Sequence, residues 1–191
     1  GQLKELTNAL GEEQTNYYDS EHASYAVKEI KDCNGEISKF NYDEDRNIEG
    51  IIDKAGNSTH TEYNEKGKPT VVTDREGNSL TCTYNQDGSL PIKYTDALGD
   101  EVSLNYDENK FLVSTTYPYK EGENVAVHYT YDSNGYPDAV IDSLGNITNY
   151  DYDNTGRLLK VIFPNGAKEE FIYDENERLH QIRGTDSEGN S

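Results

Sequence analysis

The 191-residue sequence lacks tryptophan and methionine, and it contains only five prolines and two cysteines. Hydrophobic residues make up 32% of the chain, which is little for the core of a compact domain. Cys33 and Cys82 are too few for a disulfide framework or a four-ligand zinc site, so we expect both thiols to be free. No apolar run approaches the ~20 residues that cross a bilayer, so the sequence predicts no membrane insertion.

Positive charge is also scarce, because 17 lysines and arginines face 37 aspartates and glutamates, for a formal net charge of −20. No basic run could neutralise phosphates, which excludes nucleic acid as a partner. The four histidines have no serine or cysteine nucleophile visibly placed beside them, so the sequence predicts neither an enzyme nor a cofactor site.

Among known metal sites, the sequence is most similar to the calcium-binding loop of an EF-hand. Residues 151–162 place Asp151, Asp153 and Thr155 at the first, third and fifth positions of an EF-hand loop, with Gly156 at the sixth. The twelfth position, where a bidentate glutamate belongs, is Ile162, and strands are expected on both sides. We therefore interpret Asp153 as the cap of a turn, and weak calcium sites between acidic turns stay the alternative.

Tyrosine is abundant and regularly spaced. Eight anchor tyrosines recur at intervals of 21 to 25 residues: Tyr18, Tyr42, Tyr63, Tyr84, Tyr106, Tyr131, Tyr152 and Tyr173. A second marker, an Asp or Asn followed by two further residues and glycine, recurs with them, and in seven of eight units its glycine lies seven residues before the tyrosine. Gly122, nine residues before Tyr131, is the exception. A fixed period of this length predicts a repeat architecture.

Each unit contains two turns about ten residues apart, which we call the marker turn (before the anchor tyrosine) and the anchor turn (after it). The Asx-x-x-Gly pattern suits a type I turn followed by a left-handed residue, because glycine takes positive φ without a Cβ clash. The predicted turn glycines are Gly11, Gly35, Gly56, Gly77, Gly99, Gly145, Gly156, Gly166 and Gly189.

Between the turns the residues alternate as half-buried strands do: Leu80, Cys82 and Tyr84 share one face and threonines take the other. Apolar residues follow each tyrosine at six and usually nine positions, as Leu158 and Val161 do after Tyr152. These patterns predict an all-β protein in which repeated antiparallel β-hairpins form a meander of roughly sixteen short strands, coiled into a spiral sheet or open shell. A four-bladed propeller is the alternative architecture.

We expect one continuous repeat domain over residues 1–191, with about eight units and a start in mid-repeat. The period is irregular near residues 21–28 and 115–124, where a functional surface would be sought first. Four tyrosines outside the anchor phase are candidates for an exposed binding patch: Tyr25, Tyr117, Tyr119 and Tyr136.

The pattern resembles a known family. YDNTGRL at 152–158 is close to the signature of the RHS or YD repeats of bacterial polymorphic toxins, insecticidal ABC toxin complexes and animal teneurins, and YDENERL at 173–179 differs mainly by Glu177 in place of glycine. The resemblance implies a β-shell that in the toxins encloses a toxic cargo, and an extracellular or cell-surface location. It implies as partner the remainder of a parent polypeptide, and the chain itself would be scaffold.

Two further interactions stay open at this stage. Repeats of this kind are also associated with carbohydrate binding, so an extracellular module that binds glycan or a cell-surface protein is the alternative function. Open end strands could pair between chains, which makes an edge-strand homodimer a further expectation.

Overall fold

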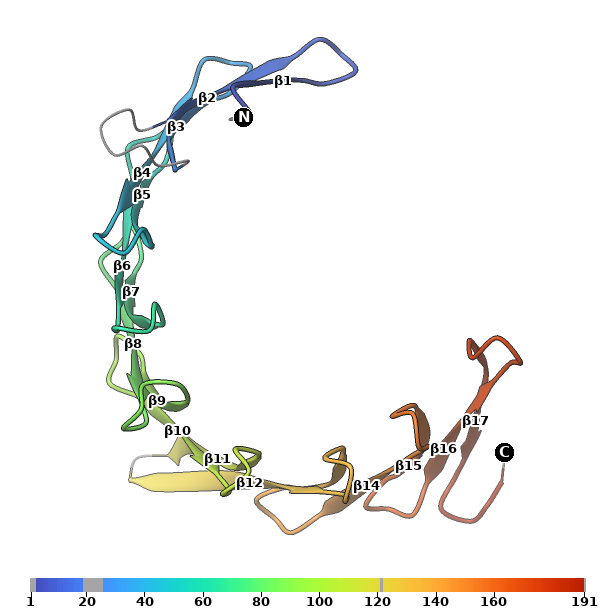
Figure 1. The fold of residues 1–191 in the computed structure, drawn as a ribbon. Helices are drawn as coiled ribbons and strands as arrows, with labels where there is room; N and C mark the ends of the chain where they lie inside the picture. The colour runs from blue at the N-terminus through green and yellow to red at the C-terminus, as the bar shows by residue number, and fades with distance from the viewer. Residues whose placement is uncertain (1–2, 19–25, 121, 191) are drawn as a thin grey trace. The chain divides into compact units, whose positions relative to one another are not determined.

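The computed structural model describes residues 3–18, 26–120 and 122–190, and every regular element in these ranges is a β-strand (Figure 1). The described residues form seventeen strands, which divide between two compact units at residues 1–101 and 102–191. The predicted all-β hairpin architecture is confirmed. That residues 1–191 act as one continuous domain stays a prediction.

In the first unit each strand pairs antiparallel with the strands before and after it in the sequence. This unbroken run is longer than the four-stranded blade of a propeller, so the propeller alternative is wrong. Its strands are β1 (Glu5–Thr7), β2 (Glu13–Tyr18), β3 (Val27–Lys31), β4 (Ile37–Tyr42), β5 (Ile48–Ile52), β6 (Ser58–Tyr63), β7 (Pro69–Thr73), β8 (Ser79–Tyr84) and β9 (Pro91–Thr95).

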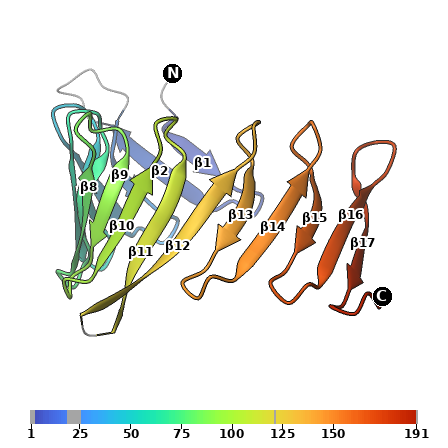
Figure 2. The ribbon, with the colours of Figure 1, turned by 90° about the horizontal axis from the view of Figure 1, so that it is seen from below.

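The second unit has the same topology, and Figure 2 shows its strands side by side with turns at alternate edges. Its first strand, β10, begins at Glu101, which is the last residue of the first unit. The strands are β10 (Glu101–Tyr106), β11 (Leu112–Lys120), β12 (Glu123–Tyr131), β13 (Pro137–Ile141), β14 (Ile147–Tyr152), β15 (Leu158–Ile162), β16 (Lys168–Tyr173) and β17 (Leu179–Thr185).

The irregular segment at 115–124 forms the longest hairpin described, because β11 and β12 each have nine residues where most strands have five or six. In the other irregular segment, 21–28, most residues, including Tyr25, lie outside the described residues.

A β-bulge recurs immediately before every anchor tyrosine. In the pairing of β14 with β15, Tyr150 lies opposite Val161 and Tyr152 lies opposite Leu158, so one extra residue is accommodated in β15. The bulge brings Leu158 and Val161, three residues apart, onto one face together with both tyrosines. We call this the anchor face. The opposite face carries cross-strand ion pairs such as Lys160 with Asp151, at 2.6 Å.

Each unit is a single layer of sheet, and burial is correspondingly shallow. Val161 is the one buried hydrophobic side chain among the described residues, with 6% exposure. On the anchor face of the first unit, Ile51 and Val72 remain 39% and 42% exposed. Within each unit, no described element covers this face.

Candidate functional site: the tyrosine sockets

Six anchor tyrosines share one contact. Each of their hydroxyls donates a hydrogen bond to a backbone carbonyl earlier in the chain. For four of them this carbonyl belongs to the first residue after the preceding anchor turn. Tyr63, for example, bonds the Ile48 carbonyl at 2.7 Å. The other five hydroxyl-to-carbonyl pairs are Tyr18 with Leu3, Tyr42 with Val27, Tyr84 with Pro69, Tyr131 with Leu112 and Tyr173 with Leu158, at 2.6 to 2.9 Å.

We call each acceptor carbonyl, together with the side chain of the residue just before it, a tyrosine socket. The sockets connect one hairpin to the next, because the tyrosine and the carbonyl that it bonds belong to successive repeats. The bond spans 15 residues, except for Tyr131, where the longer β11–β12 hairpin raises the separation to 19. A phenylalanine would supply a ring of similar size but could not make this bond.

In the second unit the last residue of three anchor turns also packs on the ring of the following anchor tyrosine. Phe111 stacks on Tyr131 with ring centroids 4.8 Å apart, and Tyr136 lies 5.4 Å from Tyr152. The third case is a cation–π contact, in which the Arg157 guanidinium carbon lies 5.1 Å from the centre of the Tyr173 ring.

Burial of the rings raises the pKa of several anchor tyrosine hydroxyls. Burial raises the pKa of Tyr42, Tyr131 and Tyr152, because the charged phenolate would lose hydration. Burial, reinforced by Cys82, raises the pKa of Tyr84 to about 12. The hydroxyls therefore stay protonated at neutral pH and act as hydrogen-bond donors.

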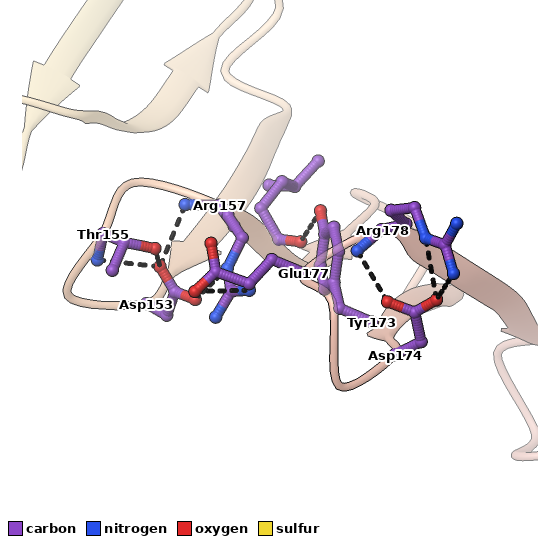
Figure 3. A network of polar contacts seen from close by, with 8 residues as sticks. Asp153, Thr155, Arg157, Tyr173, Asp174, Glu177 and Arg178 are labelled. Atoms are coloured by element: carbon purple, nitrogen blue, oxygen red, sulfur yellow. Dashed lines mark hydrogen bonds and ion pairs between the residues drawn. The ribbon is translucent and has the colours of Figure 1, made fainter.

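The turns that position the sockets are organised by aspartate side chains. In the turn of Figure 3, Asp153 Oδ1 accepts hydrogen bonds from the Thr155 hydroxyl and from the backbone N–H groups of Thr155 and Arg157. Its Oδ2 accepts one from Arg157 Nε at 2.6 Å. These donors, the Thr155 hydroxyl foremost, lower the pKa of Asp153. The carboxylate is engaged within its own turn, which agrees with the turn-cap interpretation.

The residue before the last position of each turn adopts positive φ. All nine predicted turn glycines do so, with φ between 80° and 88°. Arg46, Lys110 and Glu177 take the same conformation without being glycine, at φ values of 64° to 71°. At Gly156 the ring of Tyr136 adds a second requirement, because a Cβ there would lie 2.5 Å from the Tyr136 hydroxyl oxygen.

The candidate binding tyrosines are not brought together as one patch. Tyr117 and Tyr119 both lie on β11 and are 39% and 59% exposed, and Tyr119 lies at a register shift between Pro118 and Lys120. Tyr136 is half-buried beside the Tyr152 ring instead of exposed, because Gly156 leaves room for its ring. Tyr25 cannot be placed, since it is outside the described residues.

Other chemistry is sparse in the part of the chain that the structure describes. It contains no group of three or more His, Cys, Asp or Glu side chains arranged to hold a metal ion. Cys33 is exposed and Cys82 half-buried, and neither is bridged. Within residues 3–18, 26–120 and 122–190 there is also no helix long and apolar enough to cross a membrane.

A single-layer sheet whose tyrosines connect successive hairpins defines a YD-type repeat protein. The sequence matches the profile of the Teneurin YD-shell family over residues 4–190, and the chain belongs to this family. No curated protein matches the sequence.

Solved structures with a similar fold include two toxin complexes. The TcdB2-TccC3-Cdc42 structure matches with a TM-score of 0.78 and 16% identity, and the TcdB2-TccC3 structure with 0.77 and 17%. Both matches cover 96% of this chain but only 11% of the matched chain. At such identities the likeness concerns the fold, and the chain spans about a ninth of the length of these structures.

Proposed function

We propose that the chain is a wall segment of a larger secreted or surface-displayed YD-shell protein, related to the toxin shells, whose role is structural and not enzymatic. The uncovered anchor face is the observation that carries this proposal. The described residues bury a single hydrophobic side chain between them, so a hairpin gains little from a core of its own and its stability comes from neighbouring hairpins. The partner is then the remainder of a parent polypeptide, with a toxic cargo as one candidate.

The dye 1-anilinonaphthalene-8-sulfonate, which fluoresces on exposed apolar surface, tests whether the anchor face is open. We expect the chain to bind the dye, and the double variant Ile51→Thr/Val72→Thr to bind at least twofold less with unchanged circular dichroism. Lys39→Thr/Glu62→Thr, on the opposite face of the same unit, is the matched control and should leave dye binding unchanged. A folded chain that does not bind the dye would contradict an open anchor face and remove the basis of the wall proposal.

An extracellular adhesion module is the second candidate function, and the β11–β12 hairpin is the observation that favours it. Tyr117 and Tyr119 are exposed on one strand of a hairpin that is longer than its neighbours, and exposed aromatic rings can stack on sugars or fill a protein pocket. Saturable binding to specific glycans on an array, lost in Tyr117→Ala/Tyr119→Ala but kept in Tyr17→Ala, would replace the wall proposal by this one. Tyr17 is a fair control because it is 48% exposed on β2.

A further inference from the structure

The β11–β12 hairpin extends beyond the strands on either side of it. Thr116 is the last residue of β11 that pairs with β10, and His128 is the first residue of β12 that pairs with β13. Beyond these residues the two strands continue to pair with each other, and Figure 2 shows them extending past the turn that joins β13 to β14. The hairpin therefore has two open backbone edges inside the second unit, which we call the β11 edge (residues 117–120) and the β12 edge (residues 123–127).

The neighbouring turn shows which backbone groups point outward at these edges. Along a strand, the N–H and C=O groups of successive residues point alternately to its two neighbours. The N–H group of Asp132 donates to the Tyr136 carbonyl, on the β13 side of β12. Residues an even number of positions earlier point the same way, and at the β12 edge these are Asn124 and Ala126. Pro118 lies opposite Asn124, so it holds the outward position on the β11 edge.

The two edges differ in how they are protected against pairing. At the outward position of the β11 edge, Pro118 has no N–H group to donate, and the register shifts between Pro118 and Lys120. Proline, irregular register and lysine are features that block open edges in natural sheets. The β12 edge contains no proline or lysine, and Asn124 and Ala126 keep both backbone groups. The β12 edge is therefore the one that can accept a further strand.

The apolar side chains beside the β12 edge indicate part of the partner's chemistry. Val125 and Val127 alternate with Asn124 and Ala126 and lie on the anchor face with Tyr129, and both valines are half-buried. A strand added at this edge places every second side chain beside the valines. Apolar residues in alternation suit these positions.

The charges at the ends of the β12 edge indicate the rest. Glu123 lies at one end, where Lys120 opposite it holds its ammonium group over the Tyr119 ring, 4.9 Å from the ring centre. Asp142, the residue after β13, lies at the other end, and its carboxylate accepts a hydrogen bond from the neutral Asn146 amide at 2.8 Å. Two carboxylates favour a cationic partner. A second copy of the chain, with its own Glu123 and a net charge of −20, is disfavoured by like-charge repulsion.

We propose that the β12 edge is a docking surface for an extended segment of a partner protein, with apolar residues in alternation and a lysine or arginine at each end. The segment pairs with Asn124 and Ala126 by backbone hydrogen bonds, and its cations lie near Glu123 and Asp142. This inference goes beyond the proposed wall function and does not depend on it, because the contact is made by backbone groups outside the paired part of the sheet.

The peptide acetyl-Lys-Val-Thr-Val-Thr-Lys-amide is the probe, titrated into the complete ¹⁵N-labelled chain. We expect saturable amide NMR shifts confined to residues 123–129 and 140–146, with slower hydrogen exchange at Asn124 and Ala126. The same peptide with glutamate in place of both lysines should bind about fivefold more weakly, because its charges oppose those of Glu123 and Asp142.

A pair of variants tests the role of the backbone donor. Ala126→Pro removes the outward N–H group but no donor to β11, and it should weaken binding of the lysine peptide about tenfold. Ala126→Thr changes the side chain and keeps the N–H group, so this matched control should bind within about twofold of the parent chain. Unchanged amide shifts at residues 112–117 confirm that the hairpin of each variant is folded.

Any of four results would overturn the proposal. These are no saturable shift at residues 123–127, equal affinity of the lysine and glutamate peptides, undiminished binding to folded Ala126→Pro, and concentration-dependent shifts of the β12 edge without peptide. The last result would make a second copy the occupant, and the first two need no variant of the chain. Dye binding at Ile51 and Val72 reports on the first unit, so failure of docking is distinguishable from failure of the wall proposal.

Discussion

The residues at the end of the anchor turns, which lie beside the next anchor tyrosine, differ between the two units. In the second unit the last residue of three anchor turns is Phe111, Tyr136 or Arg157, and each contacts the ring of the next anchor tyrosine. In the first unit the corresponding residues include Asn47 and Lys68, which offer no comparable ring. The buried side chains of the described residues also all lie in the second unit. The hydroxyl bond is thus common to both units, and contact of the ring with the last turn residue is an addition in the second unit.

Valine at Gly156 should have the largest effect, because it tests the crowded socket of the second unit. The substitution combines positive φ with a clash against Tyr136, and we expect it to lower the free energy of unfolding by more than ~2 kcal/mol. Gly77→Val and Gly145→Val, where a Cβ would meet open space, should cost roughly 1 kcal/mol from φ alone. Urea unfolding followed by circular dichroism measures all three, and equal losses would argue against the ring contact.

Truncation of the Tyr136 ring should have the second-largest effect on stability. Tyr136→Ala removes the contacts with Tyr152 and Gly156 and should cost about 2 kcal/mol of unfolding free energy. Lys68→Ala, at the same turn position in the first unit, should change stability by less than ~0.5 kcal/mol. If the lysine variant lost as much as the tyrosine variant, the difference between the units would be unsupported.

Removal of a hydroxyl should affect both units alike. Tyr63→Phe and Tyr173→Phe each delete the donor to one carbonyl, and we expect each to cost about 1 kcal/mol. Melting temperatures of the two variants should therefore fall by similar amounts. A loss in only one variant would show that the hydroxyl bond is not the common element of the repeats.

The smallest effect is expected at the turns that lack glycine. Glu177 in the second unit and Arg46 in the first hold positive φ, so Glu177→Gly and Arg46→Gly should each stabilise the chain by about 0.5 kcal/mol. The ion pair that Glu177 makes with Arg157, at 3.9 Å and largely exposed, contributes little against this gain. A lower urea midpoint for either glycine variant would contradict the assignment of backbone strain.

The turns and strands could be predicted from the sequence because their signals are local. An Asx residue and a glycine at fixed spacing define each turn, as Gly77 and Gly145 illustrate, and alternation defines the strand that follows. The turn at Glu177 shows that the repeat retains its backbone geometry where the glycine is absent. Local sequence could not show how much of the anchor face stays uncovered, since this depends on contacts between repeats.

The sockets themselves were not predicted, although a signal for part of them was present. Strict alternation cannot place Leu158 and Val161, three residues apart, on one face, so their spacing already required a bulge. The acceptor of the tyrosine hydroxyl is a backbone carbonyl, and a carbonyl leaves no trace in residue identity. The sequence predicts an exposed Tyr136 because this residue lies outside the anchor phase. The prediction missed its partners, Tyr152 and Gly156, since only the pairing of separate hairpins brings them to it.

Each hydroxyl bond connects a hairpin only to the one before it, so the protein can be extended by whole repeats. Duplication of a 21-residue segment such as 153–173 would add one tyrosine, one acceptor carbonyl and two turns together, and every existing bond would keep its partner. A deletion of one residue within a strand would instead turn the side chains that follow to the wrong face. Chain length in this architecture can therefore change during evolution in whole repeats. Each added repeat contains a backbone carbonyl that can accept the hydroxyl bond of the next tyrosine.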